Sequence, residues 1–372
     1  MVSLALVAIF IVLYTYAGYP LLVALWARIA PRPVLGQDGF EPTVSICFAV
    51  HNGQDHLTQK VLNLQSLDYP ASKLQLLIFS DGSTDDTERL LVDLAARDPR
   101  IQFLSSPERL GKPTGLNRLL RLATGEVLLL CDVRQIIGRS ALRSLLHDLS
   151  DPSVGCVSGS LVLAGETGAG VYWRYERLIR AAEARLGRMV GVSGSLYAVR
   201  RADMPDLPSD ILLDDMFVPL RVALATGKRI VLAESAEALD SACDDEHEFR
   251  RKVRTLAGNY QLIAKMPRLL LPGSNPVWFQ LISHKIARLV CPWALAAVFC
   301  AAGVLSLHRD LSVVETSTWR ALFFAQCGFY GAASLGARAG RLGALARTFV
   351  VLNAAAVVGL FRFVRGSQAV TW

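Results

Sequence analysis

The chain has 372 residues and a formal net charge of +7, with 52% hydrophobic and only 19% charged residues. A mean hydropathy of +0.36 excludes an ordinary pair of soluble domains. The seven cysteines are scattered and lack CxxC spacing, which excludes a disulfide framework or a zinc site, and no basic run alternates with aromatic residues as in nucleic-acid-binding segments.

Apolar segments lie at the two ends of the chain. Residues 2–27 contain no charged residue and are long enough to cross a bilayer, and they lack the basic start and the cleavage site of a signal peptide. Three more apolar segments follow at 289–307, 321–337 and 348–361. Lys and Arg next to these segments predict that the middle of the chain is cytoplasmic and the N-terminus is outside.

Strands and helices alternate between residues 43 and 149. The expected strands are 43–50, 74–80, 100–104 and 127–131, and the expected helices are 54–67, 86–97, 111–123 and 140–149. This alternation predicts an α/β fold with a mostly parallel, Rossmann-like sheet.

The pattern changes after residue 150. Strands are expected at 154–163, 191–200 and 229–233, and helices at 172–186 and 212–226. Residues 246–266 read as a basic amphipathic helix at the bilayer surface. We therefore divide the chain into an anchor with linker (1–40), a catalytic domain (41–245), interfacial helices (246–285) and a membrane region (286–372).

Five polar clusters follow expected strands or open expected helices. They are His51 with Asn52, Asp81, Asp132 with Arg134, Asp214 with Asp215, and the basic group Lys112, Arg250, Arg251, Lys252 and Arg254. A polar turn, a helix cap or a solvated basic face would explain each cluster taken alone. Asp132, however, ends a continuous apolar strand, and ligands of open α/β sheets bind at that edge.

The order of the clusters resembles the membrane-bound family 2 glycosyltransferases, whose catalytic domain has the GT-A fold, and the resemblance covers nearly the whole chain. The motifs that carry it are Thr43-Val-Ser-Ile with His51-Asn52, Phe79-Ser-Asp-Gly-Ser-Thr-Asp85, Gly111-Lys112 with Leu116-Asn117, Asp132-Val-Arg134, Gly194-Ser-Leu-Tyr-Ala198, Asp214-Asp215 and Arg251-Lys-Val-Arg254-Thr255. Ser80 and Arg134 each replace an aspartate of the family. The segment Arg251-Lys-Val-Arg254-Thr255 keeps Arg254 but lacks the glutamine and the tryptophan of the motif in processive synthases, and Thr255 stands at the tryptophan position.

The resemblance implies a nucleotide-sugar donor, with a UDP-sugar expected, and a role for each cluster. The residues expected to bind the donor are His51, Asn52, Asp81, Lys112, Asp132, Arg134, Arg251 and Arg254. Asp132 can hold Mg²⁺ or Mn²⁺, because these hard cations prefer oxygen ligands and bridge phosphates. Asp215 is the expected general base for an acceptor hydroxyl, with Asp214 as its orienter or as a second metal ligand.

Arg134 leaves three alternatives open, because a guanidinium cannot bind a metal. Asp132 alone could hold the cation through water and phosphate oxygens. Arg134 could itself supply part of the charge, which would weaken the metal dependence. Arg134 could also point away and pair with a neighbouring carboxylate.

The function expected from this resemblance is inverting transfer of a sugar to a lipid-linked or glycan acceptor. The catalytic domain would then face the cytoplasm of a bacterial-type inner membrane, in contact with membrane lipids. The alternatives are a processive polysaccharide synthase and an inactive membrane scaffold with the same fold. A dinucleotide-binding oxidoreductase is excluded, because no Gly-x-Gly-x-x-Gly turn follows the first strand.

Overall fold

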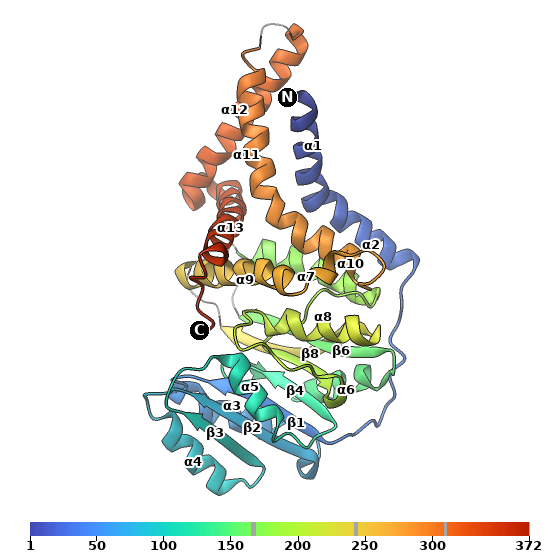
Figure 1. The fold of residues 1–372 in the computed structure, drawn as a ribbon, viewed down its shortest axis with the longest axis vertical. Coiled ribbons are helices and arrows are strands. Elements are labelled where there is room, and N and C mark those ends of the chain that lie inside the picture. Colours follow the sequence, from blue (N-terminus) through green and yellow to red (C-terminus); the bar gives the residue numbers. More distant parts are fainter. Residues whose placement is uncertain (165–168, 242–244, 309–310, 372) are drawn as a thin grey trace.

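The computed structural model describes residues 1–164, 169–241, 245–308 and 311–371 (Figure 1). A sheet with its covering helices occupies one end of the molecule, and the apolar helices occupy the other. Between them lie α7 (Ala169–Arg185), α9 (Asp245–Lys265) and α10 (Trp278–Gln280). Segments far apart in the sequence therefore meet in this middle layer.

Four neighbouring strands of the sheet are parallel, which confirms the α/β prediction. They are β1 (Val44–Val50), β2 (Leu74–Asp81), β3 (Ile101–Ser106) and β4 (Val127–Cys131), in the order β3-β2-β1-β4. Every residue of β1 and β4 is buried, which explains their unbroken apolar sequences. The carboxyl ends of these strands lie at one edge of the sheet.

The other half of the sheet is mixed. β7 (Leu196–Arg200) is antiparallel to β4 and to β6 (Val154–Ala164), whereas β6 is parallel to β8 (Arg229–Ser241). A short strand that the sequence did not predict, β5 (Ile136–Ile137), pairs with β8. The expected strand 191–200 begins only at Leu196, because Gly194 and Ser195 form a turn in which the Leu196 amide donates to the main-chain oxygen of Ser193.

Helices cover both faces of the sheet. One face packs against α3 (Gln54–Gln65), α4 (Thr87–Arg97) and α6 (Ala141–Ser150), through a core that includes Leu57, Leu91 and Leu145. The other face packs against α5 (Lys112–Leu120), α8 (Asp214–Thr226) and α9, through Leu116, Phe217 and Ala257. The helix α9 thereby joins the sheet domain to the apolar helices.

The apolar helices form the far end of the molecule (Figure 1). α1 (Val2–Leu13) continues through a π-helical turn, Tyr14–Gly18, into α2 (Tyr19–Ile29). The C-terminal helices are α11 (Ala287–Leu305), α12 (Val313–Leu335) and α13 (Gly340–Val364). Three helical stretches are long and apolar enough to cross a membrane: Val2–Ile29, Trp278–Leu305 and Val313–Val364. The last one contains both expected segments, 321–337 and 348–361, separated by a 3₁₀ turn at Gly336–Ala339.

Candidate active site

The polar residues expected after β1, β2 and β4 lie at the same edge of the sheet, because these strands are parallel neighbours. His51 Nδ1 donates a hydrogen bond to the main-chain oxygen of Asp81 at 2.8 Å. Asn52 adopts a positive φ of 48°, and its Oδ1 accepts a hydrogen bond from the Thr84 amide at 2.8 Å. His51 and Asn52 therefore fasten the end of β1 to the turn after β2.

The carboxylate of Asp81 is fully buried and holds the loop that precedes α5. It accepts hydrogen bonds from the amides of Leu110 at 2.6 Å and Gly111 at 3.0 Å. Gly111 has a φ of +85°, a conformation that glycine adopts without strain. In this structure Asp81 thus determines where α5 starts, and α5 starts with Lys112.

Lys112 brings two of the expected clusters together. Its Nζ lies 2.9 Å from Asp132 Oδ1 and 3.3 Å from Asp214 Oδ2. Burial disfavours the ammonium, but the charges of Asp132 and Asp214 outweigh this effect and raise the pKa of Lys112 above its usual value. The side chain of Asp132 is 41% exposed and that of Asp214 only 11%. Asp132 therefore keeps an oxygen for an incoming ligand, whereas Asp214 is enclosed.

Asp215 lies on the first turn of α8, where its main-chain oxygen accepts a hydrogen bond from the amide of Val192 at 2.9 Å. Burial and the neighbouring charge of Asp214 raise the pKa of Asp215 to about 6, against the lowering effect of Lys112. Its Oδ1 is buried and has no hydrogen-bond partner among the described residues. A carboxylate with this pKa and an uncommitted oxygen is suited to accept a proton near neutral pH.

Arg134 forms an ion pair with a carboxylate of β8. Its Nη2 donates to Asp240 Oδ2 at 2.8 Å, and Gln135 Nε2 donates to the same oxygen at 3.0 Å. The side chain of Asp240 is 1% exposed, so this pair compensates a buried charge. Of the three alternatives for Arg134, this contact agrees with pairing to a neighbouring carboxylate.

The basic residues of α9 reach the site through the C-terminal end of the chain, which returns from α13 toward α9 and the sheet (Figure 1). Arg254 Nη2 donates to the main-chain oxygen of Val370 at 3.1 Å. Val370 Cγ1 lies 3.1 Å from the point where a β-carbon on Gly111 would be. Arg251 is exposed one turn earlier on α9, and its main-chain oxygen accepts from Thr255 Oγ1. Arg254 is thus linked to the loop before Lys112, and Arg251 is not part of that link.

Among the expected site residues, the carboxylate of Asp132 is accessible to a divalent cation. The described residues contain no group of three His, Cys, Asp or Glu side chains that could hold a metal. Asp132 shares one oxygen with Lys112, and its exposed side chain leaves the other oxygen available. Mg²⁺ is commonly bound by one or two carboxylates together with substrate phosphates. The residues present therefore fit a cation that Asp132 shares with a bound diphosphate.

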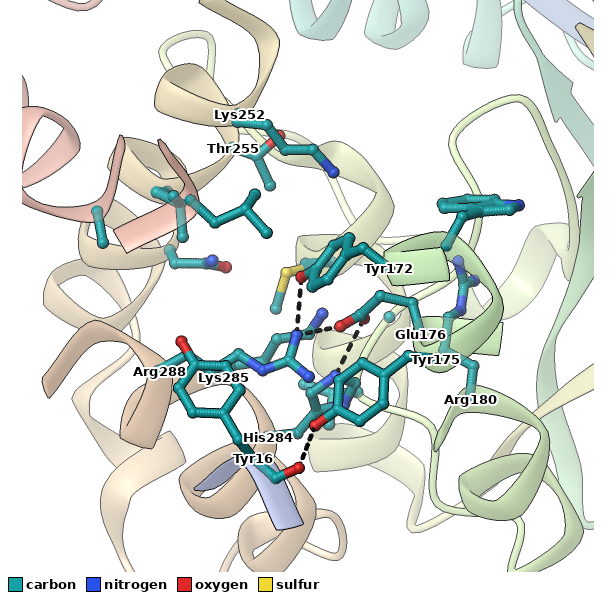
Figure 2. Close-up of a pocket in the computed structure, with 18 of the residues that line it drawn as sticks. Tyr16, Tyr172, Tyr175, Glu176, Arg180, Lys252, Thr255, His284, Lys285 and Arg288 are labelled. Atoms are coloured by element: carbon teal, nitrogen blue, oxygen red, sulfur yellow. Dashed lines mark hydrogen bonds and ion pairs between the residues drawn. The ribbon is translucent and has the colours of Figure 1, made fainter. Parts of the chain in front are cut away.

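A cavity of about 500 Å³ lies between the sheet domain and the apolar helices, with Asp215 in its wall. Figure 2 shows the charged residues of this cavity, which come from α7, α9 and the start of the second apolar stretch. Of these residues, only Lys252 belongs to a cluster that the sequence pattern indicated. Glu176, Arg180 and Glu183 have helical spacing on one face of α7, but His284, the partner of both glutamates, lies about a hundred positions further along the chain.

Comparison with known proteins identifies the sheet domain. Residues 45–199 match the family model Glycosyl transferase family 2. An N-acetylglucosaminyltransferase of Rhizobium sp. (strain N33) is 27% identical over 203 residues, which are 52% of this chain and 45% of that protein. A beta-monoglucosyldiacylglycerol synthase of Nostoc sp. (strain PCC 7120 / SAG 25.82 / UTEX 2576) is 31% identical over 148 residues, which are 39% of this chain and 31% of that protein. The chain thus spans half or less of the length of these curated relatives.

The fold is similar to that of a solved mannosyltransferase from Pyrobaculum calidifontis in complex with GDP-Man and Mn²⁺. The two structures superpose with a TM-score of 0.75, over 97% of this chain and 99% of the other, at 24% sequence identity. This similarity covers the sheet domain and the apolar helices together, and it shows that the two chains share their whole fold.

Proposed function

Because residues 45–199 form a glycosyltransferase family 2 domain in a GT-A fold, we propose that this chain is an inverting glycosyltransferase. It moves a sugar from a nucleotide-sugar donor to a membrane-associated glycan or lipid-linked acceptor. The observation that carries the proposal is the carboxylate of Asp215, whose pKa is raised to about 6 and which borders a cavity reaching the apolar helices. The relatives named above act in glycan or glycolipid synthesis, and we place this chain in the same kind of pathway.

The donor occupies the edge of the sheet after β1, β2 and β4. Its diphosphate lies near Lys112 and Asp132, where the ammonium compensates negative charge. His51, Asn52 and Asp81 support the adjoining loops, as their hydrogen bonds indicate. Both UDP-sugars and GDP-sugars are candidate donors, since the structural neighbour was solved with GDP-Man.

The transfer itself needs a base, an attacking oxygen and a stabilised leaving group. Asp215 accepts the proton of an acceptor hydroxyl, and the hydroxyl oxygen then attacks the anomeric carbon of the donor. The bond from that carbon to the diphosphate oxygen breaks, and the nucleoside diphosphate leaves with the electron pair. Lys112 stabilises the charge that develops there. A single attack from the opposite face inverts the anomeric configuration.

A divalent cation is part of the proposal, since Asp132 keeps an accessible oxygen. When bound, it neutralises charge on the departing diphosphate. We expect EDTA to reduce nucleotide release by at least tenfold, and Mn²⁺ or Mg²⁺ to restore it. Activity that remains complete in EDTA would contradict the metal role of Asp132 and leave neutralisation to Lys112.

The enzyme proposal is tested by nucleotide release from a panel of UDP- and GDP-sugars, using the purified full chain in neutral detergent. We expect one donor to be consumed and Asp215→Asn to lower turnover by about a thousandfold, a loss in the range of general-base removal. Asp93→Asn, an exposed carboxylate of α4, is the matched control and should retain activity. A chain that consumes no donor, or an Asp215→Asn variant that matches the unmodified chain, would favour the inactive scaffold.

The catalytic domain is proposed to lie on the cytoplasmic side of a bacterial-type inner membrane. Three helical stretches can span a bilayer by length and composition. Nucleotide sugars are made in the cytoplasm, and the interfacial helix α9 is rich in Lys and Arg.

Product length distinguishes single addition from processive synthesis: we expect a single added sugar, since Thr255 offers no aromatic face for stacking on a growing glycan.

A further inference from the structure

The cavity beside Asp215 combines an apolar wall with several charged groups. One apolar wall comes from α13, which belongs to one of the candidate membrane spans. The residues of this wall are Leu345, Phe349, Leu352 and Ala356. Glu176 and Arg180 of α7 lie on the opposite side of the cavity (Figure 2), and Glu183 of the same helix also lines it. A ligand of this cavity would therefore have an apolar part and a polar part.

Two glutamates of the cavity already have partners. Glu183 Oε1 lies 2.8 Å from His284 Nδ1, and Glu176 Oε2 lies 3.2 Å from His284 Nε2. An ionised carboxylate can only accept, so each ring nitrogen of His284 that bears a proton donates to the glutamate facing it. Glu176 also pairs with Arg288, and the charges of Arg288 and His284 overcome the effect of burial and hold the pKa of Glu176 well below its usual value. His284 and Arg288 are thus the named cavity partners of Glu176 and Glu183.

Two further cations in the cavity have no carboxylate partner. Among the residues that the structure describes, Lys285 makes no hydrogen bond or ion pair, and Arg180 makes only a 3.4 Å hydrogen bond to Ser158 Oγ. Both line the cavity (Figure 2). The remaining carboxylate in the wall is Asp215, the proposed base. Lys252 of α9 also lines the cavity, so Arg180, Lys252, Lys285 and Arg288 are four cations against the three carboxylates of Glu176, Glu183 and Asp215. The cavity therefore carries an excess of one positive charge, without counting His284, even when Asp215 is ionised.

A partly enclosed excess of positive charge is unfavourable unless an anion compensates it. Ammonium and guanidinium groups bind phosphate oxygens through strong, charge-assisted hydrogen bonds. Both cations line the same cavity as the apolar wall of α13 and the proposed base. A phosphate bound by them would therefore share this cavity with a lipid chain along α13 and with a hydroxyl facing Asp215.

We propose that the acceptor of this enzyme is a long-chain lipid that carries a phosphate or diphosphate, bound by Lys285 and Arg180, with its chain along α13. The inference rests on the proposed function and names its acceptor class. The hydroxyl that reacts belongs to a group attached beyond the phosphate and faces Asp215. Its proton passes to Asp215, its oxygen forms the new bond to the anomeric carbon, and the nucleoside diphosphate leaves with the electrons of the broken bond.

The test compares the binding of three radiolabelled probes to the full chain in neutral detergent: citronellyl phosphate, citronellol and inorganic phosphate. We expect citronellyl phosphate to bind at least tenfold more tightly than citronellol, and inorganic phosphate to bind far more weakly than either. In Lys285→Gln and in Arg180→Gln the preference for the phosphate should fall about tenfold, and Lys285→Arg should retain it. Lys265→Gln, on the exposed side of α9, is the matched control and should keep the full preference.

Three results would overturn the inference. One is equal binding of citronellyl phosphate and citronellol by the unmodified chain. Another is an undiminished preference in Lys285→Gln and Arg180→Gln, both of which are checked for folding by thermal melting. The third is inorganic phosphate binding as tightly as citronellyl phosphate, which would assign the cations to a free anion. Nucleotide release from the donor panel is measured in the same preparation. An absence of nucleotide release would contradict the proposed function. The binding of the three probes tests only the proposed acceptor class.

Discussion

The ammonium of Lys112 lies between two carboxylates that differ in their exposure. Asp132 is partly open to solvent and Asp214 is enclosed. Burial and the enclosed charge of Asp214 disfavour ionisation of its neighbour Asp215 and raise the pKa of Asp215. Environment rather than residue type therefore separates a charge-balancing carboxylate from a candidate base.

The pH dependence of activity follows from the raised pKa of Asp215. A base acts when it is ionised, so we expect kcat/KM to be constant well above pH 6 and to fall about tenfold per pH unit well below it. Asp214→Asn removes the neighbouring negative charge, which lowers the pKa of Asp215 and moves this acid limb to lower pH. The measurement is kcat/KM against pH for both proteins. An acid limb that stays in place would mean that Asp214 does not control the titration of Asp215.

Arg134 is expected to contribute to stability through Asp240. In Arg134→Asp two carboxylates face each other, and Asp240 is left buried with Gln135 as its remaining named partner. We expect a loss of about 2 kcal/mol, less than for a fully buried pair because the side chain of Arg134 is 36% exposed. Thermal melting in detergent measures this loss. A gain in Mn²⁺-dependent activity at unchanged stability would instead mean that Arg134 stands in for a metal ligand.

At the scale of elements, the sequence predicts β1 to β4 and their helices well, because unbroken apolar runs alternate with helical periodicity. It does not reveal how Asp81 is used, since its partners are main-chain amides 29 and 30 residues away. The Arg134–Asp240 pair joins positions 106 residues apart, and no local pattern specifies it. The charged cavity could not be predicted from the sequence either. The helical spacing of the charged residues of α7 is visible in the sequence, but His284 reaches them only because distant helices pack together.

The helix α7 is attached to the first and second candidate spans by one hydrogen-bonded group. Glu183 accepts from Tyr19 at 2.5 Å and pairs with His284. Tyr19→Phe removes one buried hydrogen bond and should cost about 1 kcal/mol. Glu183→Ala leaves the Tyr19 hydroxyl and His284 Nδ1 without their acceptor, although His284 Nε2 still faces Glu176, and should cost about 3 kcal/mol or more. Melting temperatures in detergent should fall in the order unmodified chain, Tyr19→Phe, Glu183→Ala. Glu88→Ala, an exposed glutamate of α4, is the control and should melt like the unmodified chain. Equal effects of Tyr19→Phe and Glu183→Ala would show that the group does not depend on Glu183.

At the scale of the whole molecule, the polar and apolar parts lie at opposite ends. The N-terminus, the C-terminal end of α11 and the N-terminal end of α12 lie at the apolar end, far from the sheet (Figure 1). Arg28 lies in the last turn of α2, at the end of the first apolar stretch from which the chain continues into the sheet domain. Basic residues next to a span favour the cytoplasmic side. The arrangement therefore predicts that the sheet is inside the cell and that the connection from α11 to α12 is outside.

Cysteine labelling in intact cells tests this orientation in a variant whose seven native cysteines are replaced. Leu307→Cys lies just after α11, where Leu307 is 77% exposed, and should react with a membrane-impermeant maleimide. Asp38→Cys lies in the exposed linker before β1 and should react only after the cells are permeabilised. Labelling of Asp38→Cys in intact cells would place the sheet outside, where a transferase has no supply of cytoplasmic nucleotide sugars. The proposed donor and the proposed orientation therefore depend on each other, and this experiment tests both.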